Sequence, residues 1–130
     1  MVRAATIITV SDAPTTPLGL TASLSGGIVQ LDWTPSAPGT APIAGYNIYR
    51  ATSSGFTPGA ATFRTQVPGA GTASFADAAV VAGVTYCYVV RAVDVNGLES
   101  ASSNQDCAGL VVPAPPPVPP QPSGTPAAPV

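Results

Sequence analysis

Glycine and proline interrupt this chain of 130 residues along its whole length, and they restrict the regular structure that it can form. The sequence holds 13 glycines and 16 prolines. Both residues are unfavourable inside helices, so a long helical bundle is not expected. The segments between them are rich in β-branched and aromatic residues and alternate apolar with polar side chains, which is typical of short strands. The predicted fold class is therefore all-β.

The middle of the chain, residues 14–112, contains seven such segments. Alternation with a period of two places Trp33 on the inward face of the second segment, and Tyr46 and Ile48 on the inward face of the third. Seven short strands in about 100 residues are typical of an immunoglobulin-like sandwich. The predicted strands cover residues 18–22, 28–33, 43–50, 62–67, 72–77, 84–93 and 103–112.

The two ends of the chain differ in composition from the middle. Residues 113–130 hold nine prolines and are expected to be a polyproline II or disordered linker. Residues 1–13 are a β-prone arm, which is expected to add a strand to a neighbouring subunit or domain, to lengthen the first strand of its own domain, or to fray. The arm lacks the apolar core of a signal peptide, so either the chain starts at Met1 or it is a fragment of a longer secreted protein. The candidate strand-addition residues are Arg3, Thr6, Ile7, Ile8, Thr9 and Val10.

The charged residues exclude several functions. Four basic residues, all arginines, stand against six acidic ones, and the chain has no histidine. A nucleic-acid partner is not expected, because neutralising phosphates needs clustered basic residues. A catalytic triad and a histidine-ligated metal site need histidine, and a Schiff base needs lysine. No cofactor or metal is therefore expected. No apolar run is long enough to span a bilayer, so membrane insertion is not expected either.

Five pieces of residues 14–112 resemble, in order, the fibronectin type III family in its bacterial extracellular form. They are the opening P-x-x-P-x-x-L-like residues 14–20, the tryptophan-containing residues 29–35, residues 43–50, residues 83–94, and the hairpin residues 96–104. The resemblance implies a seven-stranded sandwich, with Trp33 filling the core. It says little about function, because this fold carries many roles.

The roles of three aromatic residues can also be predicted without the resemblance. Trp33 has the largest apolar area in the chain and is expected in the core, the alternative being an exposed ring that stacks on sugar. Tyr86 opens the sixth strand and fits a tyrosine corner, whose hydroxyl bonds the backbone upstream. Tyr88 shares the inward face with Tyr86.

The two cysteines are predicted to face each other across the last two strands. A hairpin centred on residues 96–97 places Cys87 opposite Cys107, within disulfide range, although a bulge would shift the register. A disulfide would imply an oxidising compartment. The alternatives are two reduced thiols and a disulfide between subunits.

The outer face of the third and sixth strands is the candidate interaction surface. An exposed tyrosine and arginine beside an apolar residue are typical of the centre of an interface, the alternative being cross-strand packing on a solvated sheet. The candidate surface consists of Asn47, Tyr49, Val89 and Arg91.

Two carboxylates, Asp94 and Glu99, flank the hairpin loop. We expect Asp94 to bond the local backbone and Glu99 to be solvated, and we do not expect them to form a catalytic pair.

Two hypotheses of function fit these features. The first is a non-catalytic extracellular structural or adhesive module that mediates protein–protein contacts. The second is a self-assembling subunit of a surface filament or virion, whose arm and tail bind neighbouring subunits. The expected location is extracellular or at the cell surface, with the virion as the alternative. The expected partner is a protein, including a second copy of this chain, and a carbohydrate is the remaining candidate.

Overall fold

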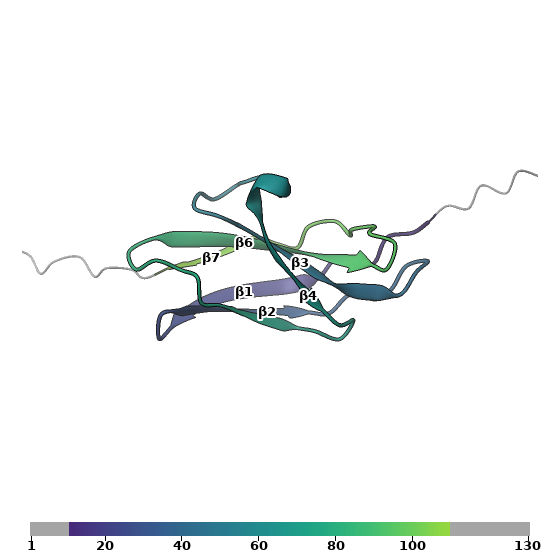
Figure 1. Cartoon of the computed structure of the whole chain (residues 1–130), viewed down its shortest axis with the longest axis horizontal. Helices are drawn as coiled ribbons and strands as arrows, with labels where there is room; N and C mark the ends of the chain where they lie inside the picture. Colours follow the sequence, from purple (N-terminus) through teal and green to yellow (C-terminus); the bar gives the residue numbers. More distant parts are fainter. Residues whose placement is uncertain (1–10, 110–130) are drawn as a thin grey trace, which may run out of the picture.

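A computed structural model describes residues 11–109, which form two antiparallel sheets packed face to face (Figure 1). Sheet A has the strand order β1-β2-β5, and sheet B has the order β4-β3-β6-β7. A short 3₁₀ helix, η1 (Ala60–Thr62), precedes β4. The strands are β1 (Leu18–Ser25), β2 (Ile28–Thr34), β3 (Ile43–Ala51), β4 (Phe63–Pro68), β5 (Ser74–Asp77), β6 (Thr85–Asp94) and β7 (Asp106–Gly109).

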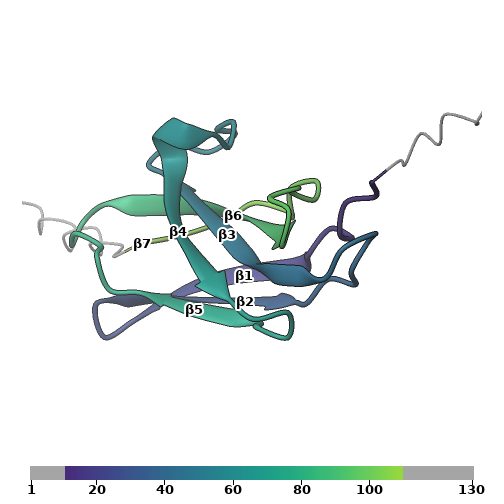
Figure 2. The same ribbon diagram turned by 45° about the vertical axis from the view of Figure 1, so that its right-hand side comes forward.

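This architecture is the predicted all-β, seven-stranded sandwich. Figure 2 shows β4 running from the helical turn at the top of the molecule down towards β5, along one open side of the sandwich. The predicted arm lies outside the described residues except for residues 11–13, which belong to no strand or helix. The predicted tail, residues 113–130, and the last three residues of the predicted seventh strand also lie outside them.

The first hairpin extends β1 beyond its predicted end. Ser25 pairs with Ile28, so only two residues make the turn. Gly26 and Gly27 both have positive φ, 59° and 79°. A two-residue hairpin of type I′ requires this at both positions, and glycine adopts it without steric cost. The turn is therefore tight, and β1 continues up to it.

The core lies between the sheets and is built from the inward faces of both. The Trp33 ring lies 5.5 Å from the Tyr46 ring, centroid to centroid. Tyr46, Ile48 and Tyr88 are completely buried, and Trp33 and Tyr86 are 5% and 6% exposed. The five residues that the sequence placed in the core thus lie there. The buried cluster consists of Leu20, Val29, Leu31, Trp33, Ile43, Tyr46, Ile48, Tyr86, Tyr88, Val90 and Ala92.

The segment before β7 replaces main-chain pairing with serine side chains. The Ser100 N–H donates to the Ala92 carbonyl at 2.8 Å, and the Ala92 N–H donates back to Ser100 Oγ at 2.9 Å. Ser103 makes the same pair of bonds with Val90, both at 2.9 Å. These bonds satisfy buried groups of β6 without a regular strand. The predicted strand over residues 103–112 accordingly begins only at Asp106.

Two side chains of the same region tie sheet B to the edge of sheet A. Asn104 accepts from the Leu20 N–H at 2.8 Å and donates to the Leu20 carbonyl at 2.9 Å. Asp106 accepts from the Ala22 N–H at 2.8 Å. The three bonds occupy backbone groups on the free edge of β1, which protects that edge from pairing with another strand.

Candidate functional site

The predicted interaction surface on the outer face of sheet B is covered. Asn47, Tyr49 and Val89 are only 8%, 5% and 4% exposed. The expectation that these three side chains are exposed is therefore wrong, and only Arg91 is partly accessible. Sequence alternation placed the four residues on the correct face, but it does not show what lies above that face.

Glu99 covers this surface, because the β6–β7 turn brings its carboxylate over the sheet. The carboxylate accepts hydrogen bonds from Asn47 Nδ2 at 2.6 Å and from the Tyr49 hydroxyl, and it pairs with Arg91 at 3.2 Å. The Arg91 guanidinium also lies 5.7 Å from the centre of the Tyr49 ring. The expectation of a solvated Glu99 is therefore wrong. We call these four residues, Asn47, Tyr49, Arg91 and Glu99, the Glu99 cluster.

Contacts within the Glu99 cluster keep the Glu99 carboxylate charged and the Tyr49 hydroxyl protonated. Burial by itself raises the pKa of Glu99, but hydrogen bonds from Tyr49, Asn47 and Arg91 outweigh it and hold the pKa below its usual value. Burial and the bond to Glu99 raise the pKa of Tyr49 to about 12. The hydroxyl therefore remains a donor, and the carboxylate an acceptor, across the neutral range.

Replacing Glu99 by glutamine should lower the free energy of unfolding by about 1–2 kcal/mol at neutral pH, because charge-assisted bonds become neutral ones. Urea denaturation of the variant and the wild type measures the difference. Asp32→Asn is the matched control, because Asp32 is exposed. The folded pKa of Glu99 lies below the unfolded value, so its contribution is present above about pH 4 and lost as the pH falls further. A loss that is equal for both variants would contradict the role of the cluster.

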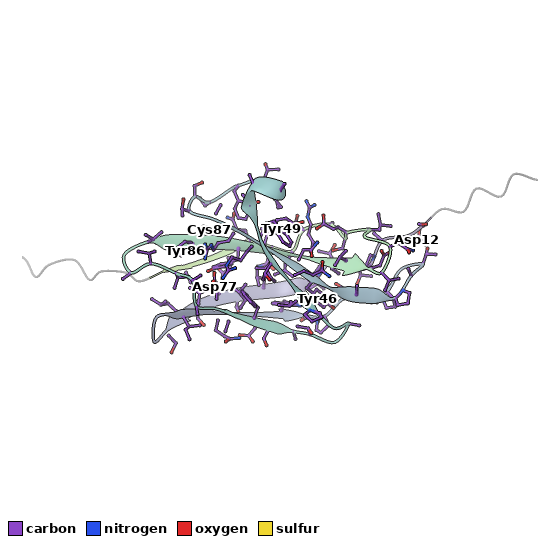
Figure 3. The ribbon with its side chains drawn as sticks, in the orientation of Figure 1. Asp12, Tyr46, Tyr49, Asp77, Tyr86 and Cys87 are labelled. Carbon is purple, nitrogen blue, oxygen red and sulfur yellow. A yellow bond between two sulfur atoms is a disulfide. The ribbon has the colours of Figure 1, made fainter. Side chains whose placement is uncertain are left out.

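A second polar cluster lies between the sheets, and sequence reasoning missed it. Asp77, at the end of β5, is completely buried. Its carboxylate pairs with Arg50 at 2.8 Å and with Arg64 at 3.1 Å. It also accepts from the Tyr88 hydroxyl at 2.8 Å and from the Ala79 N–H at 3.1 Å. Figure 3 shows Asp77 inside the sandwich beside Tyr86, whereas Tyr49 and Cys87 lie on the outer side of sheet B.

We call Asp77 and its partners Arg50, Arg64 and Tyr88 the Asp77 cluster. It joins four strands around one carboxylate. Burial alone raises the pKa of Asp77, but the bonds from Tyr88, Arg50 and Ala79 outweigh it and hold the pKa below its ordinary value. The carboxylate is therefore charged in the folded protein. The sequence does contain a signal: Asp77 is in phase with Phe75, and Arg50 is in phase with the core residues of β3. An acid and an arginine at inward positions of their strands indicate an ion pair.

The hairpin turn between β6 and residue 99 is closed by Asp94. Its carboxylate accepts from the Asn96 and Leu98 N–H groups, both at 2.9 Å. The predicted local turn bonding of Asp94 is confirmed. Tyr86 also bonds as predicted, since its hydroxyl accepts from the Val81 N–H at 3.0 Å, five residues upstream. Both residues thus serve to position loops.

Cys87 and Cys107 are bonded to each other. They face each other in the β6–β7 pairing, and their sulfur atoms are 2.07 Å apart. The facing pair falls where a hairpin centred on residues 96–97 places it, although the intervening residues leave the regular ladder. The bond fastens the four-residue β7 to the longest strand of sheet B.

Reduction of this disulfide should lower the free energy of unfolding by about 3 kcal/mol, because the bond closes a loop of 20 residues in the unfolded chain. Urea denaturation with and without reductant measures the loss. Intact mass after alkylation, with and without prior reduction, verifies the bonded state. Two thiols that react freely in the native protein would contradict the prediction.

The described residues offer few other places for chemistry. Within residues 11–109, no group of three or more histidine, cysteine or acidic residues could hold a metal ion. The same residues contain no helix that is long and apolar enough to cross a membrane. Each arginine in this range, Arg50, Arg64 and Arg91, forms an ion pair with Asp77 or Glu99. These three arginines are thus used in holding the strands together.

Comparison with known proteins agrees with this reading of the fold. No protein-family model matches the chain. The chain is 36% identical over 92 residues to exoglucanase B from Cellulomonas fimi. The matched segment makes up 70% of this chain but only 7% of that protein. It is also similar to the solved structure of an Fn3-like protein from Clostridium thermocellum, with a TM-score of 0.58 and 29% identity over 77% of this chain and 96% of that one.

The chain is a fibronectin type III-like domain. More distant structures share the fold of this fibronectin type III-like domain. Pectate lyase Pel3 from Pectobacterium carotovorum matches with a TM-score of 0.54 at 21% identity, over 79% of this chain and 28% of that one. The spore cortex lytic enzyme SleM from Clostridium perfringens matches with a TM-score of 0.55 at 18% identity, over 74% of this chain and 28% of that one. The domain thus resembles a small part of each of these larger proteins.

Proposed function

We propose that this fibronectin type III-like domain works outside the cell as an accessory module of a larger polypeptide, where it positions neighbouring parts through protein–protein contacts. The match to exoglucanase B carries the proposal. A segment of 92 residues there is 36% identical to this chain and makes up only 7% of the whole protein. A domain of this size beside a much larger enzyme fits the role of a spacer or a contact element.

The disulfide supports the extracellular location. Bonds such as Cys87–Cys107 persist in oxidising compartments and are rare in the cytosol. The low charge supports a life beside other protein surfaces, since charged residues make up 8% of the chain, against about 25% in typical soluble proteins.

The proposed contact region is the open side of sheet B at β4. This strand pairs with β3 on one side only, so its other edge can bond to a strand of a neighbour. Phe63, at the start of β4, is 47% exposed. Its ring packs edge-on against the buried Tyr49, with the two ring centroids 5.8 Å apart. An exposed aromatic ring beside an edge strand is typical of a protein contact.

The carbohydrate alternative is tested with insoluble substrates. Purified full chain is mixed with crystalline cellulose or with insoluble polygalacturonate, and the protein left in the supernatant and the reducing sugar released are measured. The module is expected to stay in solution and to release no sugar. Saturable retention on either polymer would contradict the proposal, and its loss in Phe63→Ala would place the sugar site on β4.

The same open edge is the observation that favours the second hypothesis, a self-assembling subunit. The candidate donor strand is residues 3–10, which lie outside the described residues. In that case deletion of residues 1–12 should abolish assembly and leave the domain folded, whereas deletion of residues 113–130 should only weaken assembly. Sedimentation of the three forms separates the two hypotheses.

A further inference from the structure

The turn between β6 and Glu99 contains an asparagine directly before a glycine. Asn96 and Gly97 are both exposed, and Gly97 has a φ of 86°. Among the described residues, no atom beyond its chain neighbours lies within 4 Å of the place that a Cβ atom would take at Gly97. Glycine also leaves its own amide nitrogen unshielded. The turn therefore has room for a reaction between the Asn96 side chain and the Gly97 nitrogen.

The two other asparagines of the chain stand in different surroundings. Asn47 precedes an isoleucine, is 8% exposed, and donates a hydrogen bond from its side chain to Glu99. Asn104 precedes a glutamine, and two hydrogen bonds hold its side-chain amide against the backbone of β1. A following side chain hinders the approach of its backbone nitrogen, and a bonded amide cannot turn towards that nitrogen. Asn96 alone combines an exposed amide with a following glycine.

We propose that Asn96 is a site of spontaneous deamidation. The Gly97 nitrogen attacks Cγ of Asn96 and bonds to it, and the side-chain nitrogen leaves as ammonia with the proton that the Gly97 amide loses. Water then opens the cyclic imide at either of its two carbonyl carbons. One opening leaves aspartate at position 96. The other leaves isoaspartate, in which the main chain runs through the side-chain carbons and gains one atom.

The gained atom falls inside the hydrogen bonds that shape the turn. The Asp94 carboxylate accepts from the Asn96 and Leu98 N–H groups, both at 2.9 Å, and the Asp94 carbonyl accepts from the Gly97 N–H at 3.0 Å. The longer main chain between residues 96 and 97 separates these donors. They can no longer all meet the groups of Asp94 at these distances.

The same turn holds Glu99 over the outer face of sheet B. Glu99 forms an isolated bridge with Val93, so the turn is closed and has to take up the added atom within itself. Glu99 also follows the displaced Leu98 directly. We therefore expect isoaspartate at position 96 to loosen the bonds of the Glu99 cluster and to uncover that face as the protein ages.

The first test follows the reaction in the full chain during incubation at body temperature and mildly alkaline pH. Peptide mapping by mass spectrometry, with an isoaspartate-specific methyltransferase as the label, identifies the products. Isoaspartate and aspartate should accumulate at position 96, whereas Asn47 and Asn104 should keep their amides. Asn96→Gln is the matched control, because its longer side chain disfavours the cyclic imide, and the label on this peptide should be lost.

The second test compares thermal midpoints. The isoaspartate form, separated from the unreacted chain, should melt about 4–8 °C lower. Asn96→Asp adds the charge without the extra atom and should stay within about 2 °C of the wild type. In a Glu99→Gln background the fall caused by isoaspartate should be smaller, because the two changes act on the same contacts.

Three results would overturn the proposal. Asn96 that stays intact in the folded chain, under conditions in which the urea-unfolded chain reacts, would show that the turn prevents the reaction. Equal modification of Asn104 would show that the following glycine does not select the site. An isoaspartate form that melts with the wild type, or falls equally in the Glu99→Gln background, would show that the turn does not act through Glu99.

Discussion

Replacing Trp33 by alanine should lower the free energy of unfolding by about 3–5 kcal/mol. The ring is 5% exposed and packs against Tyr46 in the middle of the core, so its removal leaves a cavity that the two sheets cannot close without moving. The midpoint of urea denaturation, with its slope, measures the loss.

Val95→Ala is the control for the Trp33 substitution. Val95 is 60% exposed, so the same kind of truncation should change the free energy of unfolding by about 0.5 kcal/mol or less. A wild-type midpoint for Trp33→Ala would place the ring at the surface, and would favour the exposed ring that stacks on sugar.

Replacing Asp77 by alanine should also cost about 3–5 kcal/mol, because it leaves the buried Tyr88 hydroxyl without its acceptor and two arginines without their partner. Asp77→Asn keeps an acceptor oxygen and should cost less. Denaturation in urea at neutral pH measures both losses.

The pH dependence identifies the charge as the cause. The folded pKa of Asp77 is below its unfolded value of about 4, so its contribution is present above about pH 4 and lost as the pH falls through the folded pKa. The difference between wild type and Asp77→Asn should therefore shrink in acid. A difference that stays constant down to about pH 2 would show that the carboxylate acts by shape alone.

The residues whose role follows from local pattern were predictable. Alternation places Trp33, Tyr46, Ile48, Tyr86 and Tyr88 in the core, because one face of each strand must be buried. The hairpin signal at residues 96–97 was enough to set the cysteines opposite each other, since an antiparallel register follows from its turn.

Contacts between distant segments were not predictable in the same way. Glu99 covers Asn47 and Tyr49 across about fifty positions of sequence, and no local pattern shows that the turn folds over the sheet. The shortening of β7 has a similar cause, because Ser100 and Ser103 replace the ladder with side-chain bonds that a strand pattern does not encode. The inward position of Asp77 could have been predicted from alternation, but its partners come from three other strands.

Sedimentation velocity of the full chain, over a wide range of concentration and under non-reducing conditions, tests the proposed role as a module most directly. The proposal predicts one species with the monomer mass of 12.8 kDa at every concentration. Large species that grow with concentration, and that disappear when residues 1–12 are deleted, would contradict the module and show a self-assembling subunit.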